Sequence, residues 1–287
     1  MSSPDSGQVK NSYFIDIESG AETARLIEQD RLMTEAMGGI FPEQPDLTDV
    51  AKVLDLACGP GGWALEVAFQ HQDMDVLGVD LNETMVKYAR ALAKVQQLRN
   101  VQFEVMDVKQ PLTFEDNSFD LVNARLIASF MDRTSWLALI AECKRILRPG
   151  GILRLSELEF TVSSSAALQR FTSALYQALS RQGRTFSVDG RSEGIIHMLS
   201  KLLRDAGFEE IGNRAFHLDA SYGMPMNYSA CKDAEVAIAL LKPFLLRAGT
   251  INEAEYDDLY NQLLAEMAST EFTCINLGMT TWGKKPA

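Results

Sequence analysis

Apolar residues are arranged in two alternating patterns along most of this chain. Short continuous apolar runs bounded by Gly, Pro or Asp are typical of strands buried in a parallel sheet. Between them, apolar residues recur about every three to four positions, which is typical of amphipathic helices. These patterns predict strands at 52–57, 75–80, 101–106, 119–124 and 152–157, and helices at 63–70, 83–98 and 134–147.

Strands that alternate with helices predict an α/β fold with a doubly wound, mostly parallel sheet. After residue 157 the alternation breaks, and the pattern predicts helices at 163–181, 193–205, 232–247 and 253–267 and strands at 208–218 and 273–282. We therefore expect seven strands, with helical cap insertions at about 160–191 and 223–270. A further helix at 22–37 belongs to an N-terminal leader or lid, residues 1–48, that precedes the main domain at 49–287.

Composition and charge exclude several classes of protein. The chain has 287 residues, of which 46% are hydrophobic, and this is enough for a sizeable core. The formal net charge of −12 opposes binding to nucleic acid or to anionic membranes. No apolar run is long enough to span a bilayer, and the four cysteines form no C-x-x-C pair. We expect a cytoplasmic protein with no metal site and no membrane insertion.

A glycine-rich turn follows the first predicted strand. The segment Val53-Leu-Asp-Leu-Ala-Cys-Gly-Pro-Gly-Gly-Trp63 places Gly59, Gly61 and Gly62 before a predicted helix. Glycines lack a Cβ atom, so backbone N–H groups can approach a bound ligand closely. The turn lacks the G-x-G-x-x-G spacing of dinucleotide-binding folds, and a nicotinamide-dependent oxidoreductase is therefore a less favoured interpretation.

Polar residues also end the next three predicted strands. Asp80 ends the second strand, Asp107 follows the third, and Asn123-Ala-Arg125 ends the fourth. The carboxyl ends of parallel strands meet at one edge of the sheet, where ligands bind. Carboxylates accept hydrogen bonds from the ribose hydroxyls and the exocyclic amine of an adenosine. These positions together favour an adenosine-containing ligand.

The same motifs resemble class I S-adenosylmethionine-dependent methyltransferases over about residues 49–157. The motifs that carry the resemblance are the glycine segment, Gly-Val-Asp80-Leu-Asn-Glu-Thr-Met, Met-Asp107-Val, Phe119-Asp-Leu-Val and Leu147-Arg-Pro-Gly-Gly-Ile-Leu. The likeness is strongest to the small-molecule branch that includes the ubiquinone/menaquinone-biosynthesis enzymes. It implies a Rossmann-like fold with an antiparallel last strand, S-adenosylmethionine as cofactor and S-adenosylhomocysteine as product.

The resemblance also implies which residues bind the cofactor. Asp55 and the Gly59–Gly61 backbone would hold its methionine end, Asp80 the ribose hydroxyls, and Asp107 the adenine amine. The leader reads Glu-x-x-Arg-Leu-x-x-Gln from Glu22, like the leader of related small-molecule enzymes, and would close over the cofactor; an ordinary surface helix is an equal alternative. The complete predicted set is Tyr13, Arg25, Gln29, Asp55, Ala57, Gly59, Gly61, Asp80, Leu81, Met85, Asp107, Val108 and Asn123.

The methyl acceptor is less well specified. In-line methyl transfer can be accelerated by proximity and orientation alone, so a general base is optional. The candidates for acting on the acceptor are Arg125, Glu157 and His217. Four further residues, Phe171, Tyr176, Met224 and Met226, suggest an apolar pocket for a small hydrophobic or aromatic acceptor, methylated on oxygen, nitrogen or carbon. A cofactor-binding regulatory protein without turnover is the alternative, and a homodimer is compatible with either.

Overall fold

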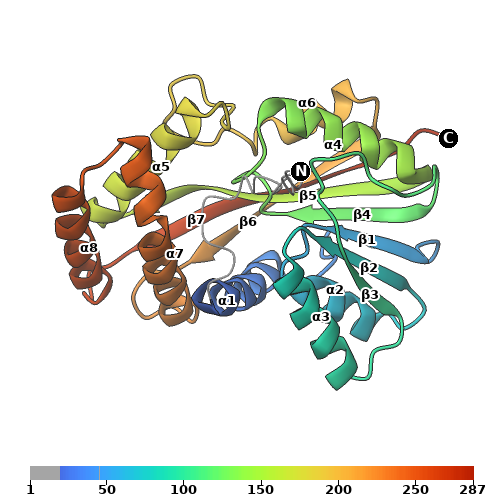
Figure 1. The fold of residues 1–287 in the computed structure, drawn as a ribbon, viewed down its shortest axis with the longest axis horizontal. Coiled ribbons are helices and arrows are strands. Elements are labelled where there is room, and N and C mark those ends of the chain that lie inside the picture. The colour runs from blue at the N-terminus through green and yellow to red at the C-terminus, as the bar shows by residue number, and fades with distance from the viewer. Residues whose placement is uncertain (1–19, 45) are drawn as a thin grey trace, which may run out of the picture.

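The computed structural model describes residues 20–44 and 46–287, and its centre is a seven-stranded sheet of order β3-β2-β1-β4-β5-β7-β6 (Figure 1). Neighbouring strands from β3 to β5 run parallel, whereas β7 is antiparallel to both β5 and β6. This topology confirms the predicted α/β fold and the antiparallel last strand. The strands are β1 (Lys52–Leu56), β2 (Asp75–Asp80), β3 (Val101–Val105), β4 (Phe119–Arg125), β5 (Leu147–Ser163), β6 (Glu209–Asp219) and β7 (Cys274–Lys284).

Helices cover both faces of the core sheet because its central strands are apolar on both faces. On one face Val53 of β1 belongs to the same buried cluster as Trp63 and Val67. On the other face Leu54 clusters with Ile140. The helices on these two faces are α2 (Gly62–Gln70) and α3 (Glu83–Val95) on the first, and α4 (Arg133–Ile146) and α6 (Leu199–Asp205) on the second (Figure 1).

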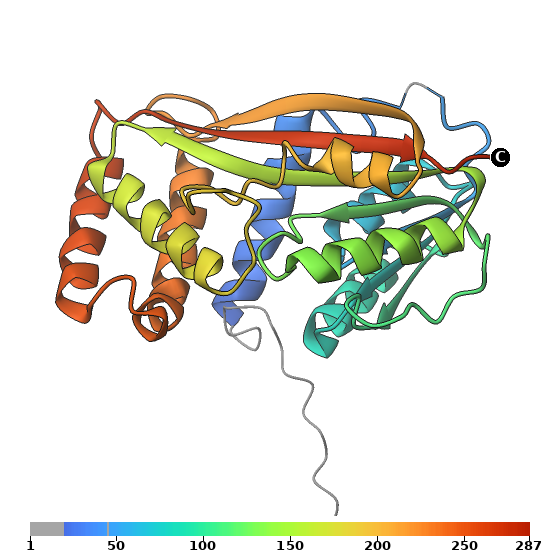
Figure 2. The same cartoon turned by 90° about the horizontal axis from the view of Figure 1, so that it is seen from above.

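Three long strands, β5, β7 and β6, extend past the core sheet and carry a separate helical layer (Figures 1 and 2). This layer contains α5 (Ala166–Arg181), α7 (Asn227–Ala248) and α8 (Glu253–Met267), with its own apolar cluster. The leader helix α1 (Gly20–Met37) lies between this layer and α2, and its Leu32 joins the cluster. The chain therefore has two apolar regions with α1 between them.

Several element boundaries differ from the sequence predictions, and the differences in two elements have a clear structural cause. The predicted helix at 193–205 begins only at Leu199, because Gly194 has a left-handed φ of 69° that interrupts a helix. A Cβ atom there would lie 2.4 Å from the backbone nitrogen of Ser187. The predicted strand at 152–157 begins earlier and runs further, as β5, because it pairs with β7 as far as Ser163.

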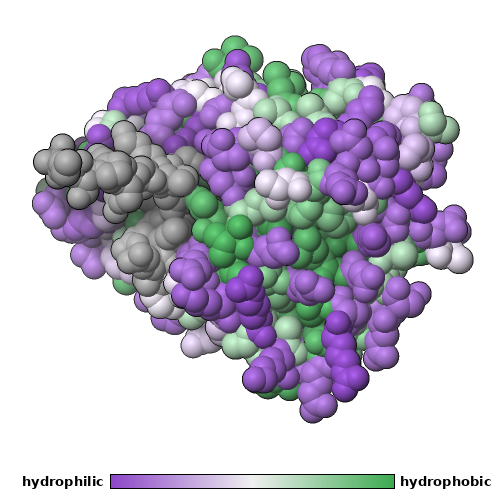
Figure 3. All heavy atoms as spheres, turned by 45° about the vertical axis from the view of Figure 1, so that its right-hand side comes forward, coloured by the Kyte–Doolittle hydropathy of each residue, from purple (hydrophilic) through white to green (hydrophobic). Residues whose placement is uncertain are grey.

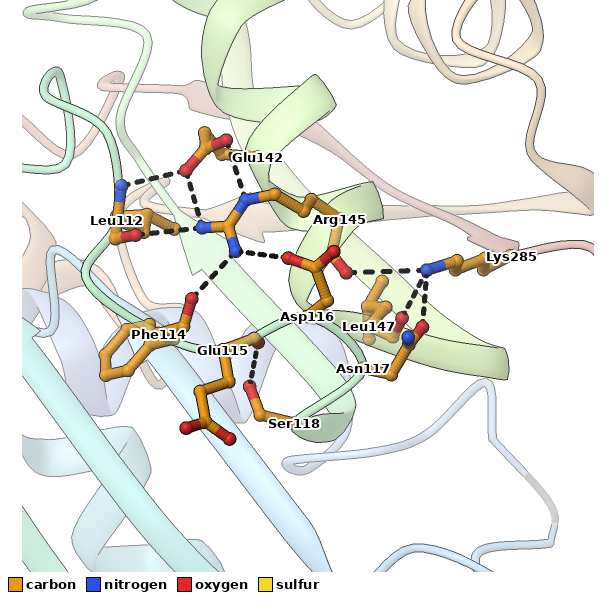
Figure 4. Close-up of polar contacts among 10 residues, drawn as sticks. All are labelled: Leu112, Phe114, Glu115, Asp116, Asn117, Ser118, Glu142, Arg145, Leu147 and Lys285. Atoms are coloured by element: carbon orange, nitrogen blue, oxygen red, sulfur yellow. Dashed lines mark hydrogen bonds and ion pairs between the residues drawn. The ribbon is translucent and has the colours of Figure 1, made fainter.

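Arg145 on α4 fixes the loop that leads into β4 (Figure 4). Its guanidinium donates hydrogen bonds to the carbonyl oxygens of Phe114 (2.7 Å) and Leu112 (2.8 Å). Lys285, after β7, donates to the carbonyl oxygen of Leu147 at 2.7 Å, where α4 ends. The loop, α4 and the segment after β7 are therefore joined by side chains, and this holds β4 in place at the centre of the sheet.

The surface is largely hydrophilic, in agreement with a mean hydropathy of −0.07. On the face shown in Figure 3, hydrophobic side chains gather in the middle and hydrophilic ones border them. Across ranges 20–44 and 46–287, no helix combines the length and apolarity that crossing a membrane requires.

Candidate active site

A cavity of about 500 Å³ lies at the carboxyl ends of β1 to β4 and continues between α1, β5 and the cap helices. Its position is the one expected for a ligand site in an open parallel sheet. The predicted site residues that line it are Arg25, Gln29, Asp55, Ala57, Gly59, Asp80, Leu81, Met85, Asp107, Val108, Arg125 and Glu157. Residues from the leader, the core and the cap therefore meet at one cavity.

Asp80 connects the glycine turn to the next strand. One carboxylate oxygen accepts a hydrogen bond from the backbone N–H of Gly59 at 2.8 Å, and the other from that of Asn82 at 2.8 Å. Burial raises the pKa of Asp80, although these two donors oppose the shift. The turn needs Gly61, whose φ is 83° and whose added Cβ would lie 2.7 Å from the Phe103 ring. Gly61 therefore shapes the turn but does not line the cavity.

Asp55 is the first member of a buried polar chain. Its Oδ1 accepts a hydrogen bond from Asn123 Nδ2 at 2.7 Å, and Asn123 Oδ1 accepts one from Arg154 Nη1 at 2.7 Å. Arg154 is paired in turn with Glu43, and the side chains of both are almost fully buried. Burial raises the pKa of Asp55 to about 7, against the opposing effect of Arg125. Asn123 thus orients Asp55 and is not part of the cavity wall.

The leader helix is attached to the sheet beside the cavity. Arg125 forms an ion pair with Asp30 of α1 and donates a hydrogen bond to Thr34 Oγ1 at 3.1 Å. Arg25, also in the cavity wall, binds Glu22 at 2.7 Å and Asp233 of α7 at 3.0 Å. Both arginines therefore hold α1 against its neighbours, and Gln29 is left facing the cavity.

Two further predicted residues, besides Gly61 and Asn123, have no described place in the cavity. Tyr13 lies outside the residues that the structure describes. His217 is exposed on β6 and does not line the cavity, which corrects its selection as a catalytic candidate. The reason is strand alternation: Phe216 and Leu218 point inward, so the side chain between them points out.

The cap side of the cavity is mostly apolar but contains three carboxylates. Phe171 and Tyr176 line it as predicted, whereas Met224 is exposed and lies outside the wall, as does Met226. Glu157 accepts hydrogen bonds from the backbone N–H groups of Ile127 (2.9 Å) and Ala128 (3.2 Å). Burial, with a contribution from Glu193, raises its pKa well above the usual value. The other two carboxylates are Glu159 and Glu193.

Several residues of the site were not identified by sequence reasoning: Asp30, Glu43, Arg154, Glu159 and Glu193. Only Arg154 gives a clear signal, because it interrupts the apolar run Ile152-Leu-Arg-Leu in a central strand and so requires a buried partner. That partner, Glu43, is 111 positions away.

The cavity wall suits an adenosyl sulfonium ligand. Asp80 and Asp107 supply acceptors for hydroxyl and amine groups, and Leu81, Met85 and Val108 supply apolar surface for a ring. Within the described parts of the chain, no group of three or more His, Cys, Asp or Glu residues could hold a metal ion.

Residues 53–151 match a protein family described as "Methyltransferase domain". The secondary metabolism regulator laeA of Coprinopsis cinerea is 28% identical in an alignment of 269 positions that covers 85% of this chain and 64% of that protein. Demethylmenaquinone methyltransferase of Lactococcus lactis is 32% identical over 37% of this chain and 41% of that protein. The structure of Haemonchus contortus phosphoethanolamine N-methyltransferase 2 with phosphomonomethylethanolamine and S-adenosylhomocysteine gives a TM-score of 0.57 at 19% identity, covering 96% of this chain and 60% of that one.

The chain spans less than two thirds of the length of each of these proteins. At 19% identity, the structural likeness establishes the fold. The family match over residues 53–151 agrees with the predicted resemblance to methyltransferases. A special relation to the quinone branch stays a prediction, since the similar proteins are named for different molecules and roles.

Proposed function

Because residues 53–151 match a family of methyltransferase domains, we propose that this chain transfers a methyl group from S-adenosylmethionine to a small organic acceptor. One observation carries the proposal: the strand-end residues Asp55, Asp80 and Asp107 line the same cavity as the apolar residues of the cap. A cofactor on the sheet side and an acceptor on the cap side would therefore share one enclosure. Proximity and orientation of this kind account for much of the acceleration of a displacement reaction.

The residues on the sheet side have separate binding roles in this proposal. When bound, the cofactor supplies an electrophilic methyl group on a sulfonium. Asp80, fixed by the N–H groups of Gly59 and Asn82, accepts from the ribose hydroxyls. Asp55, held by Asn123, receives the ammonium of the methionine end. Asp107 is fixed by the Lys109 N–H at 2.9 Å and accepts from the adenine amine.

The cap supplies the acceptor half of the site. Its wall includes Phe171, Leu175, Ile238 and Leu241, which exclude water and favour an acceptor with an apolar body. The leader α1 covers the cavity between the two halves, fastened by Arg125 on one side and Arg25 on the other. In the proposed reaction α1 acts as a lid that must loosen for exchange of ligands.

A regulatory protein without turnover is the second candidate, and one observation favours it. The relative that aligns with 85% of this chain is named as a regulator of secondary metabolism. Binding of the cofactor is common to both candidates, so only a turnover measurement separates them.

Binding and turnover are tested in sequence. Calorimetry with S-adenosylhomocysteine and with NAD tests the cofactor, and we expect heat only with the former. Labelled S-adenosylmethionine with a panel of phenols, amines and carboxylic acids then tests transfer. Absence of S-adenosylhomocysteine binding would refute both candidates, and tight binding without any transfer would favour the regulator.

A further inference from the structure

Glu157 and Glu193 face the cap side of the cavity without a basic partner among residues 20–44 and 46–287. Glu157 is 2% exposed, and both of its backbone hydrogen bonds go to Oε1, so Oε2 remains available to the cavity. The Glu193 carboxylate forms no side-chain hydrogen bond to the described part of the chain. Burial, with Glu159 nearby, raises the pKa of Glu193 to about 8. Two acidic groups are therefore held in an enclosed space that a cation would stabilise.

Glu159 holds the segment that places Glu193 in the cavity wall. Its two carboxylate oxygens accept hydrogen bonds from the backbone N–H groups of Gly194 (2.5 Å) and Ile196 (2.9 Å). These bonds hold the segment before α6 against β5. Glu159 is thus occupied with the backbone, whereas the neighbouring Glu193 is presented to the cavity.

Tyr176 is an independent sign that a polar ligand belongs here. Its side chain lines the cavity, and the residue is 9% exposed. Its hydroxyl makes no hydrogen bond within the described ranges and is therefore available to a polar ligand in the cavity. Burial, together with the charges of Glu193 and Glu159, raises the pKa of Tyr176.

The basic residues of the wall do not neutralise this group. Arg25 pairs with Glu22 and Asp233, and Arg125 pairs with Asp30. Lys109 lies 3.7 Å from Asp132, on the adenine side of the cavity. The acidic side chains at the cap end, next to the apolar wall, therefore have no basic neighbour among the described residues.

We infer that the methyl acceptor is an amine with an apolar body, and that its nitrogen binds between Glu157, Glu193 and Tyr176. The apolar body lies along Phe171, Leu175 and Leu241. A neutral acceptor would leave the two carboxylates unpaired, and an acidic one would be repelled. This inference rests on the proposed methyl transfer and specifies its acceptor class.

The transfer balances with the groups present. The bound ammonium favours the ionised form of Glu193, which then takes one proton from it and so frees the nitrogen lone pair. That pair forms the bond to the methyl carbon while the carbon–sulfur bond breaks and its electrons remain on sulfur. The products are S-adenosylhomocysteine and an N-methylammonium that carries the positive charge formerly on the sulfonium. Glu157 stabilises this charge on the product nitrogen.

Three probes of equal shape test the charge preference: 2-phenylethylamine, 2-phenylethanol and phenylacetate. Each is titrated by calorimetry into the full chain saturated with S-adenosylhomocysteine. We expect the amine to bind about tenfold more tightly than the alcohol, and the acid most weakly. Glu193→Gln, which removes the charge but keeps the shape, should reduce the preference for the amine to about twofold.

Controls separate this inference from its premise. Glu209→Gln, on an exposed residue of β6 outside the cavity, should leave the preference unchanged. Tyr176→Phe should weaken amine binding while a thermal melt shows the folded state intact. Failure of S-adenosylhomocysteine to bind refutes the proposed function itself. If S-adenosylhomocysteine binds, three outcomes refute the amine acceptor alone. These are equal affinities for amine and alcohol, no amine binding at millimolar concentration, and an unchanged preference in Glu193→Gln.

Discussion

Arg125 on β4 and Asp30 on α1 form an ion pair in the wall of the cavity. The Arg125 guanidinium also lies 5.9 Å from the centroid of the Trp63 ring, so it touches β4, α1 and α2 together. Asp30 approaches α2 so closely that a Cβ atom on Gly62 would lie 2.2 Å from its Oδ2. The leader therefore packs against the glycine turn through one acidic residue, and any opening of the lid must break this contact.

Breaking the pair should destabilise the protein measurably. We expect Arg125→Met to lower the free energy of unfolding by about 2–4 kcal/mol, because Asp30 would keep a partly buried charge without its partner. A double-mutant cycle with Asp30→Asn, followed by urea denaturation, should give a coupling energy of about 1–3 kcal/mol. Arg31→Met, on α1 next to Asp30, is the matched control. The ion pairs of Arg31 are about half exposed, so their loss should lower the free energy of unfolding by no more than about 1 kcal/mol. If the effects of Arg125→Met and Asp30→Asn on the free energy of unfolding are strictly additive, the Arg125–Asp30 pair does not have this role.

Asp80→Asn tests the link between the glycine turn and the ribose site. Replacing one carboxylate oxygen by an NH₂ group leaves the N–H of either Gly59 or Asn82 without an acceptor. We expect S-adenosylhomocysteine affinity to fall by about 10- to 100-fold in calorimetry. Asp75→Asn, at the exposed start of the same strand, should bind as the unmodified chain does. Equal affinities of the two variants would remove Asp80 from the site.

Gly61→Ala tests how closely the turn packs on the sheet. Gly61 and Gly150 both have left-handed φ angles, 83° and 77°, but only at Gly61 would a Cβ atom strike the Phe103 ring and Ala89. Gly150→Ala should therefore cost about 1 kcal/mol from backbone strain alone, and Gly61→Ala about 2–4 kcal/mol in urea unfolding. Phe103→Leu should restore part of the difference in Gly61→Ala. Equal costs at the two glycines would show that the turn adapts.

Acidic groups with raised pKa values make the ligand-free protein less stable at high pH. The folded pKa of Asp55 is about 7 against an ordinary 3.8, and that of Glu193 is about 8 against 4.5. The folded state thus holds these protons more tightly, so their contribution is complete below the ordinary values and is lost as pH rises through the folded ones. We expect the melting temperature to fall between about pH 5 and 8.

Asp55→Asn should reduce the decrease in melting temperature with rising pH, whereas Asp75→Asn, at an exposed position, should leave it unchanged. Bound S-adenosylhomocysteine should also oppose it, because its ammonium favours the ionised form of Asp55. Scanning calorimetry from pH 5 to 8 measures all three; a melting temperature that rises through this window would contradict the assignment.

The sequence was sufficient to predict the sheet and the gathering of several polar residues at its carboxyl edge. Periodicity located the strands, and the carboxyl-edge rule placed Asp80 and Asp107 beside the glycine turn, because both depend on local pattern and parallel topology. His217 failed as a candidate because one step along a strand reverses the face, and no local signal fixed the phase of β6. Glu193 was missed for another reason: backbone hydrogen bonds from Gly194 and Ile196 to Glu159 hold its segment beside the cavity.

The same limit applies to the buried ion pairs. Arg154 interrupts an apolar strand, which indicates that it has a buried acidic partner. The sequence does not indicate which residue this is, because Glu43 comes from the connector before β1. Asp30 looks like any polar residue of a surface helix until α1 is placed against β4. Such pairs are set by tertiary packing between distant segments, which periodicity does not encode.

The position of β7 has a consequence for the order in which the chain can fold during synthesis. β7 is an interior strand, yet it follows β6, α7 and α8 in the sequence. Until residues 274–284 leave the ribosome, β5 has an open edge and β6 lacks the strand that joins it to the sheet. The half of the protein that holds the glycine turn can form early, whereas the cap side of the cavity can form only after β7 has been synthesised. Nascent chains stalled before β7 should therefore present an unpaired strand edge, which is a site for chaperone binding or aggregation.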